Sequence, residues 1–262
     1  EKIEMPPPPV VMPPDPEDNP AQLNPEQQKA LDQILGLDAH AFGVALLDGV
    51  TGGGKTEVFF EAVADTLRAG RQALVLLPEI ALTNTFIDRF TRRFGTKPAE
   101  WHSDMTPAQR AKVWRGVLDG SVRAVVGARS ALFLPFRELG LMVLDEEHDG
   151  AYKQSDGFTY HARDMAIVRA NLAKARVVLS SATPSVESRN NANAGRYAHV
   201  TLEARFAEAA MPDVTAIDMR TDGPEKGEWI APALAREVFA ALDRGEQALL
   251  FLNRRGYAPL TL

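Results

Sequence analysis

The segment at residues 49–56 has residue types and spacing that suit the binding of a phosphate chain. It reads GVTGGGKT and fits the pattern G-x-x-x-x-G-K-[ST]. Its glycines let the backbone wrap with successive N–H groups turned inward, so these groups and a helix N-terminus face one anion. We expect Lys55 to neutralise nucleotide phosphates and the Thr56 hydroxyl to coordinate Mg²⁺. The loop residues expected to bind the nucleotide are Gly49, Thr51, Gly52, Gly53, Gly54, Lys55 and Thr56.

Three carboxylates follow an apolar run later in the chain. Residues 141–144 lead directly into Asp145, Glu146 and Glu147. A solvated acidic turn would give the same pattern, but phosphate-loop NTPases place a metal-binding acid on a second strand, and the loop stands roughly ninety residues earlier. We therefore expect Asp145 to hold Mg²⁺ and Glu146 to be the base that acts on water. The predicted catalytic residues are Lys55, Asp145 and Glu146.

Apolar runs alternate with helical patterns along the chain. The run 42–47 predicts a strand before the phosphate loop, and 57–68 has the apolar spacing of a helix after it. Further strands are predicted at 72–77, 123–126, 141–144 and 177–180. This alternation predicts an α/β protein with a parallel sheet, helices on both of its faces and a ligand at the carboxyl ends of the strands.

Gln27 has two possible roles. Asn24 is a good helix N-cap, Pro25 suits the first helical position, and Gln27 stands third, where its side chain can complete the cap. A glutamine about two dozen residues upstream of a phosphate loop can also hydrogen-bond an adenine edge. The spacing leaves both roles open.

Two segments beyond the acids add polar and aromatic groups. Ser181 and Thr183 follow the last predicted strand, where they can hydrogen-bond the acidic cluster or simply cap a turn. Between residues 152 and 163, aromatic and basic side chains interleave in a pattern that suits single-stranded nucleic acid, because aromatic faces stack on bases and cations meet phosphates. A packed surface loop accounts for the composition nearly as well. The residues concerned are Tyr152, Lys153, Phe158, Tyr160 and Arg163.

Composition limits the class of protein. The 262 residues are 45% hydrophobic and 24% charged, which is typical of a globular domain. The absence of cysteine excludes disulfides and thiolate metal ligands within these residues. No apolar stretch approaches the length of a membrane span and no signal segment opens the chain, so we expect a cytoplasmic protein with no membrane partner. With a net charge of −6, any surface that binds nucleic acid has to be local.

Several longer strings carry a resemblance to a known family. They are LPEIALT at 77–83, HS at 102–103, VGARSALFLPF at 126–136, DEEHD at 145–149, YKQ at 152–154, YHARD at 160–164, SATPS at 181–185 and LFLNRRGY at 250–257. Together with the phosphate loop, they resemble the helicase core of the primosomal protein N′ (PriA) family of replication-restart DNA helicases, within superfamily two. The resemblance covers almost everything from Leu23 onward.

The resemblance implies a monomeric, ATP- and Mg²⁺-dependent 3′-to-5′ DNA helicase that acts in the restart of stalled replication forks. Its implied partners are single-stranded and forked DNA, single-strand DNA-binding protein and other primosome proteins. By position, Gln27 would read adenine, and His148 and Thr183 would couple hydrolysis to DNA. Arg129 and Ser130 would contact the DNA backbone, and residues 152–163 would form an aromatic-rich loop that senses single strands.

The resemblance also divides the chain. Residues 1–22 would be a proline-rich linker, 23–211 a RecA-like ATP-binding lobe, and 212–262 an inter-lobe segment with the first elements of a second lobe. We expect the chain to be part of a longer protein, with fork-binding domains before the linker and the rest of the second lobe after residue 262. A zinc module is expected only in that later part. Because the second lobe would supply the catalytic arginine, we expect these 262 residues alone to be nearly inactive.

Two alternatives to a DNA helicase remain. One is a nucleotide-gated DNA-binding scaffold for primosome assembly that does not unwind DNA. The presence of both Lys55 and Glu146 favours an enzyme, because a switch that never hydrolyses ATP has no need of an acid that acts on water. The other is a double-stranded-DNA or RNA motor of the same superfamily, which only the family resemblance disfavours.

Overall fold

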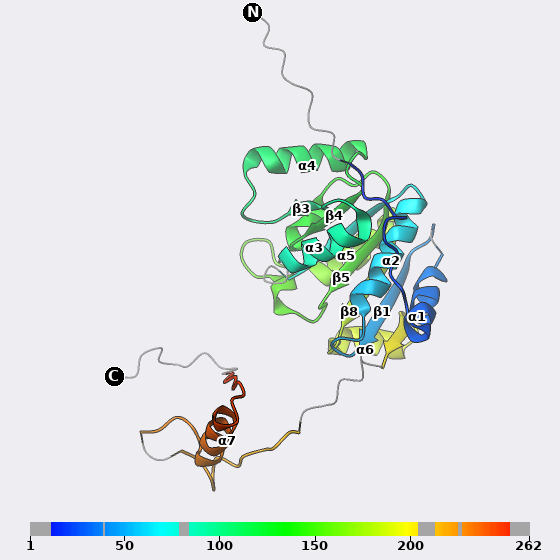
Figure 1. Ribbon diagram of the computed structural model, residues 1–262. Helices are drawn as coiled ribbons and strands as arrows, with labels where there is room; N and C mark the ends of the chain where they lie inside the picture. The colour runs from blue at the N-terminus through cyan, green and yellow to red at the C-terminus, as the bar shows by residue number, and fades with distance from the viewer. Residues whose placement is uncertain (1–11, 39, 79–83, 204–212, 225–226, 252–262) are drawn as a thin grey trace, which may run out of the picture. The chain divides into compact units, whose positions relative to one another are not determined.

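The computed structural model describes residues 12–38, 40–78, 84–203, 213–224 and 227–251 (Figure 1). The chain forms two compact units, Glu1–Ala209 and Ala210–Leu262. The domain boundary predicted after residue 211 stays a prediction, because residues 204–212 lie outside the described residues. None of the described helices is long and apolar enough to cross a membrane.

The first unit is built on a seven-stranded parallel sheet with the order β3-β4-β2-β5-β8-β1-β9. Its strands are β1 (Gly43–Gly49), β2 (Gln72–Leu76), β3 (Ala99–Trp101), β4 (Ala124–Gly127), β5 (Leu139–Asp145), β8 (Arg176–Ser181) and β9 (Ala198–Leu202). Two further strands, β6 (Lys153–Gln154) and β7 (Tyr160–His161), pair antiparallel as a separate hairpin. We call residues 153–161 the aromatic hairpin.

Helices cover both faces of this sheet, as Figure 1 shows. They are α1 (Pro25–Leu35), α2 (Lys55–Arg68), α3 (Asn84–Phe94), α4 (Pro107–Asp119), α5 (Ala162–Ala173) and α6 (Val186–Asn193), with short 3₁₀ helices η2 (Arg129–Phe133) and η3 (Gly150–Tyr152). One core lies under α1, α2 and α3 and contains Phe59 and Phe90. The other contains Val117 of α4, Ala166 of α5 and Leu132 of η2. Neighbouring residues of the central strands alternate between the two cores, as the period of a strand requires.

The α/β fold with a parallel sheet is confirmed. Strands lie at all five predicted runs, and α2 begins two residues earlier than the predicted helix. Asn24 and Gln27 form the predicted capping box of α1. The sequence analysis missed the edge strands β3 and β9, because neither is a continuous apolar run: all three residues of β3 are half-buried, and only Val200 and Leu202 of β9 are buried.

The remaining described segments have no part in the sheet. Residues 12–22 contain no helix or strand, and Arg93 of α3 donates hydrogen bonds to the carbonyls of Pro16 and Asp18 in that segment. The second unit contains one described helix, α7 (Pro232–Asp243), none of whose residues is buried.

Candidate functional site

A cavity of about 530 Å³ lies where the phosphate loop meets the end of β5. The parallel strands β1 and β5 end here, and α2 begins here, so strand ends and a helix N-terminus converge on one space. Its lining residues are Gln22, Gln27, Thr51, Gly52, Gly53, Gly54, Lys55, Thr56, Glu57, Arg89, Asp145 and Glu146. The structure thus brings nearly all predicted nucleotide and catalytic residues together.

The phosphate loop depends on glycine at two positions. Gly52 and Gly54 have φ angles of +78° and +85°, in the left-handed region that side chains rarely adopt. A Cβ on Gly54 would also lie only 2.1 Å from the Gln27 Nε2 atom. Any other residue at position 54 would therefore push Gln27 away from the loop.

Lys55 is held at the end of β1. Its Nζ atom donates to the carbonyl oxygens of Gly49, at 2.7 Å, and Val50, at 3.3 Å. Gly49 does not line the cavity, and its carbonyl holds the lysine. Contact of Gly49 with a nucleotide stays a prediction. Both bonds are to neutral carbonyls, and an anionic phosphate is the stronger acceptor for an ammonium group.

The Gln27 side chain forms the predicted cap of α1, and its hydrogen bonds do not exclude the adenine role. Its Oε1 atom accepts from the Asn24 backbone N–H at 3.0 Å, and its Nε2 atom donates to the Gly53 carbonyl at 3.1 Å. An amide oxygen has two lone pairs and an amide nitrogen has two N–H groups, so one acceptor and one donor position are left. That pair matches the N6–H and N7 edge of adenine. The adenine role stays a prediction.

The two predicted catalytic acids have different surroundings. The Asp145 carboxylate accepts a hydrogen bond of 2.8 Å from the Ser180 hydroxyl, and burial raises its pKa. Glu146 has a φ of +48°, which is uncommon for a residue with a side chain. Burial, and then the charge of Asp145, raise the pKa of Glu146. A raised pKa makes a carboxylate a better proton acceptor.

The predicted coupling residues His148, Ser181 and Thr183 lie together beside Glu146. The Nδ1 atom of His148 is 2.7 Å from the Ser181 hydroxyl and 3.6 Å from a Glu146 carboxylate oxygen. The Thr183 backbone N–H donates to the same Ser181 hydroxyl at 2.9 Å. Residues 145–148, which we call the acidic turn, are therefore connected by hydrogen bonds to the loop after β8. Whether they couple hydrolysis to DNA stays a prediction.

The aromatic hairpin exposes part of the predicted nucleic-acid surface. Phe158 is 78% exposed, and its ring lies 6.2 Å from the Tyr160 ring. Tyr160 also makes an edge-to-face contact of 5.3 Å with Phe133 of η2, which is 55% exposed. Lys153 is exposed on the same hairpin. These side chains form a surface on which bases can stack.

Arg129 and Ser130 lie next to the base of the hairpin. The Arg129 Nη1 atom donates to the carbonyls of Ala151, at 3.0 Å, and Lys153, at 2.7 Å. Ser130 is exposed in η2. The guanidinium thus supports the hairpin, and contact of either residue with DNA stays a prediction.

Two of the predicted contact residues are wrong as contacts to DNA. Tyr152 is only 1% exposed, and its hydroxyl lies 2.9 Å from the Leu76 carbonyl and 2.7 Å from the Asp145 carbonyl, so it belongs to the core. Burial raises its pKa well above the usual tyrosine range. Arg163 is 7% exposed and pairs with Glu147. Neither can reach a nucleic acid in this conformation, because both side chains are buried. The prediction failed because the sequence pattern did not show which side chains turn inward.

Some residues of the cavity were missed. Arg89 of α3 lines it and forms an ion pair of 2.6 Å with Glu57. Glu57 could have been found, because it follows the phosphate loop directly. Arg89 and Gln22 carry no motif that points to the cavity, since only the packing of distant segments brings them there.

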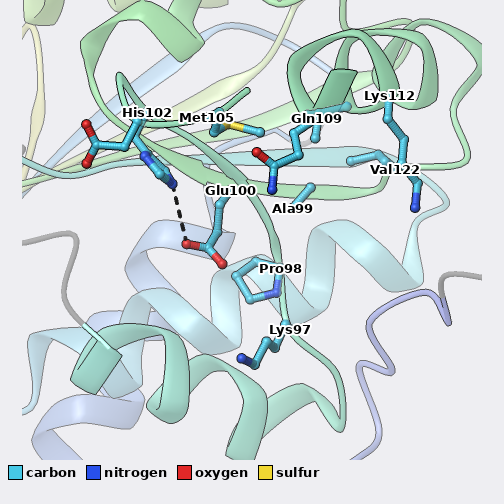
Figure 2. A pocket seen from close by; sticks show the side chains of 11 residues that line it. Lys97, Pro98, Ala99, Glu100, His102, Met105, Gln109, Lys112 and Val122 are labelled. Atoms are coloured by element: carbon cyan, nitrogen blue, oxygen red, sulfur yellow. Dashed lines mark ion pairs between the residues drawn. The ribbon is translucent and has the colours of Figure 1, made fainter. Parts of the chain in front are cut away.

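A second cavity, of about 320 Å³, lies between β3 and α4. Figure 2 shows the side chains of His102 and Glu100 turned toward one another there, 3.8 Å apart. Apolar groups such as Met105 and Val122 contribute to its lining. None of the predicted site residues lies in this cavity, so the candidate site is the cavity at the phosphate loop.

Comparison with known proteins covers the segment that contains this cavity. Residues 24–192 match the family model of the DEAD/DEAH box helicases. The chain belongs to this family. The matched segment includes the whole of the candidate site except Gln22.

The predicted resemblance to PriA is confirmed. The chain is similar to the replication restart protein PriA of Rickettsia conorii, at 50% identity over 217 residues, which are 83% of this chain and 34% of that protein. It is 43% identical to PriA of Haemophilus influenzae over 94% of this chain and 33% of that protein. For PriA of Bacillus subtilis the identity is 40%, over 93% of this chain and 30% of that protein. The chain spans about a third of the length of these relatives.

Solved structures show the same fold at lower identity. RecG bound to a three-way DNA junction has a TM-score of 0.54 and 23% identity, covering 73% of this chain and 25% of that chain. The DUF1998 helicase MrfA bound to DNA has a TM-score of 0.50 and 17% identity, covering 70% of this chain and 27% of that chain. The RecA-like α/β fold of a helicase is therefore shown.

The raised pKa of Asp145 predicts the pH dependence of stability. Because of burial, the Asp145 carboxyl binds its proton more tightly in the folded chain than in the unfolded chain. The stability that the protonated carboxyl contributes is therefore lost as pH rises through its folded-state pKa. We expect Asp145→Asn, which keeps the acceptor for Ser180, to raise the melting temperature at pH 7. The variant should also lose less stability as pH rises from about 4, the ordinary range of an aspartate pKa, to 7.

Thermal unfolding without nucleotide, measured across this pH range, checks the prediction. Asp156→Asn, which removes an exposed carboxylate of the aromatic hairpin, is the control. A melting temperature for Asp145→Asn below that of the wild type at every pH would contradict the argument from burial.

Proposed function

We propose that this protein is an ATP-dependent DNA helicase and that the cavity at the phosphate loop is its ATP-hydrolysis site. The observation that carries the proposal is the meeting of Lys55, Asp145 and Glu146 in one cavity, although the acids stand far from the lysine in the sequence. A structural turn needs neither the lysine nor two half-buried carboxylates there. The same residues also argue against a scaffold that only binds nucleotide.

The residues of the cavity fit a magnesium nucleotide. Mg²⁺ prefers oxygen ligands, and the Thr56 hydroxyl and the Asp145 carboxylate line the same space. Burial raises the pKa of Asp145, and a nearby cation would favour the charged form. When bound, Mg²⁺ would supply positive charge to the β- and γ-phosphates.

The remaining roles belong to side chains of this chain. Lys55 would exchange its two carbonyl acceptors for phosphate oxygens, and the loop N–H groups would bind the same phosphates. Gln27 would use its free donor and acceptor positions on adenine. Glu146, which lines the cavity and has a raised pKa, would accept a proton from the attacking water.

The DNA part of the proposal rests on three supports. The PriA relatives are named for replication restart, RecG and MrfA are named as bound to DNA, and the aromatic hairpin exposes the Phe158 ring and the Lys153 side chain. We therefore propose translocation on single-stranded DNA in the 3′-to-5′ direction at stalled or forked replication substrates, by a monomer that works with single-strand DNA-binding protein and other primosome proteins. The direction and the partners come from the family resemblance.

Two substitutions separate nucleotide binding from hydrolysis. We expect Lys55→Ala to abolish ATP turnover and weaken ATP binding, because the lysine stabilises phosphate charge. Glu146→Gln should bind ATP with nearly wild-type affinity and lower turnover by about 10²-fold or more, because the glutamate acts only on water. Binding is measured with a fluorescent ATP analogue and turnover by steady-state phosphate release, in the full-length protein with Mg²⁺.

Lys112→Ala is the matched control, because Lys112 lines the other cavity. Its ATP binding and turnover should equal those of the wild type. Wild-type turnover in Glu146→Gln would show that Glu146 is not the base. Wild-type affinity for ATP in Lys55→Ala would show that the nucleotide does not bind at the phosphate loop.

A further substitution tests the aromatic hairpin. If Phe158 stacks on a base, Phe158→Ala should raise the concentration of single-stranded DNA that half-saturates ATPase stimulation by about five- to a hundredfold, the range expected for loss of one stack. The DNA-free rate should not change. A titration of ATPase activity with a single-stranded oligonucleotide measures both quantities.

Tyr152→Phe is the comparator for this experiment. It removes a buried hydroxyl and should lower the free energy of unfolding by about 1 kcal/mol. Its DNA titration should match that of the wild type, because Tyr152 is buried. An unchanged titration in Phe158→Ala would show that the hairpin is only a packed surface loop.

A further inference from the structure

Glu147 is a fully buried carboxylate that takes no part in the nucleotide cavity. It stands between Glu146, the proposed base, and His148, which contacts Ser181. A buried carboxylate costs several kcal/mol unless it is paired and hydrogen-bonded. Its partners therefore show which segments of the chain it connects.

Four donors satisfy this one carboxylate. Oε1 accepts from the Ser185 backbone N–H at 2.7 Å. Oε2 accepts from the Ser185 hydroxyl at 3.0 Å, the Ser188 hydroxyl at 2.9 Å and the Arg163 Nη1 atom at 3.3 Å. The Glu147 backbone N–H also donates to the Ser180 carbonyl of β8 at 3.0 Å. We call Glu147, Arg163, Ser185 and Ser188 the buried clamp.

The buried clamp joins three segments that are far apart in the sequence. Ser185 caps the N-terminus of α6, and Ser188 lies in its first turn, so this part of the clamp holds the loop that follows β8. Arg163 lies in the first turn of α5, two residues after the end of the aromatic hairpin at His161. The third segment is the acidic turn itself, in which Glu147 is flanked by Glu146 and His148.

Arg163 makes the connection to the hairpin stiff. Its guanidinium contacts the Glu147 carboxylate, the Ser185 hydroxyl at 2.6 Å and the Asp164 carboxylate at 3.1 Å. Leaving either charge of a buried pair without its partner is strongly unfavourable, so Arg163 and Glu147 are expected to stay paired if either segment moves. Through this ion pair, a displacement of the start of α5 by a ligand on the hairpin would act on the residue next to Glu146.

We propose that Glu147 is a positioning residue that couples the aromatic hairpin to the acidic turn, through Arg163 on one side and Ser185 and Ser188 on the other. This inference rests on the proposed function, because it requires that DNA bound on the hairpin changes the rate of ATP hydrolysis. It assigns the coupling to a side chain that touches neither nucleotide nor DNA. A buried ion pair that only stabilises the fold would not transmit the effect of bound DNA to the acidic turn.

Glu147→Gln in the full-length protein tests the coupling. Glutamine keeps the size of the side chain but removes the negative charge from Arg163 and places an N–H₂ group among donors. We expect the DNA-free rate of ATP turnover and the affinity for ATP to stay within about twofold of the wild type. The stimulation by a saturating single-stranded oligonucleotide should fall by about two- to thirtyfold, the range of coupling energies for such networks.

Glu61→Gln is the matched control. Glu61 forms another buried ion pair, with Arg93, at 2.6 Å and with both side chains less than a tenth exposed. Glu61 and Arg93 lie on α2 and α3, away from the buried clamp. This variant should lose stability in thermal unfolding, as Glu147→Gln should, but it should keep the wild-type stimulation by DNA.

Ser188→Ala keeps the inference testable if Glu147→Gln does not fold. It removes one hydrogen bond from a hydroxyl to the Glu147 carboxylate and leaves the ion pair with Arg163 intact, so it should fold and still lower the stimulation by DNA. Hydrogen exchange gives a readout besides activity: binding of Mg·ADP should change amide exchange in the aromatic hairpin of the wild type, and this change should shrink in Ser188→Ala.

The outcomes separate this inference from the proposed function. A wild-type enzyme that DNA does not stimulate would overturn the proposed function and the coupling with it. If the wild type is stimulated and Ser188→Ala and any folded Glu147→Gln keep that stimulation, only the positioning role of Glu147 is overturned. Equal loss of the DNA-free and DNA-stimulated rates would reduce the buried clamp to a structural element.

Discussion

The structure around the candidate site depends on how three successive carboxylates are accommodated at the end of β5. Three charged side chains can follow a buried strand only if each is hydrogen-bonded, paired with an opposite charge or open to water. Asp145 receives the Ser180 hydroxyl, Glu146 turns into the cavity through a left-handed backbone conformation, and Glu147 is neutralised by Arg163. The left-handed backbone conformation of Glu146 is of the strained kind found at functional sites.

The opposite wall of the cavity is fixed by hydrogen bonds to main-chain carbonyls. Lys55 reaches back to the end of β1, and Gln27 connects the N-terminus of α1 to Gly53. The close approach of Gln27 to the loop is possible because Gly54 has no side chain. One wall is therefore a source of N–H groups and positive charge, and the other a source of carboxylates. A magnesium nucleotide needs both.

The sequence was sufficient for the parts of this account that depend on local pattern. Continuous apolar runs identified the five central strands, because those strands are buried on both faces. The phosphate loop and the acids were found because each is a pattern of a few consecutive residues. β3 and β9 were missed, since edge strands are only partly buried. Arg89 was missed because only tertiary packing brings α3 to the cavity.

The errors at Tyr152 and Arg163 have a common cause. Interleaved aromatic and basic residues are typical both of a nucleic-acid surface and of a segment that enters the core, and composition does not distinguish the two. A signal was present for Arg163: Ala162, Ala166 and Ala170 repeat every four residues and form the buried stripe of α5. That stripe places Arg163 at the edge of the core, where a buried acid can reach it.

Amide hydrogen exchange with and without Mg·ADP is the most direct test of the central claim, that the nucleotide binds between the phosphate loop and the acidic turn. The account predicts slower exchange at residues 51–56 and 145–148 in the bound state, because their N–H groups become bonded or excluded from water. Residues 97–113, at the second cavity, should exchange at the same rate in both states. Protection confined to residues 97–113, or no protection at the phosphate loop at saturating Mg·ADP, would contradict it.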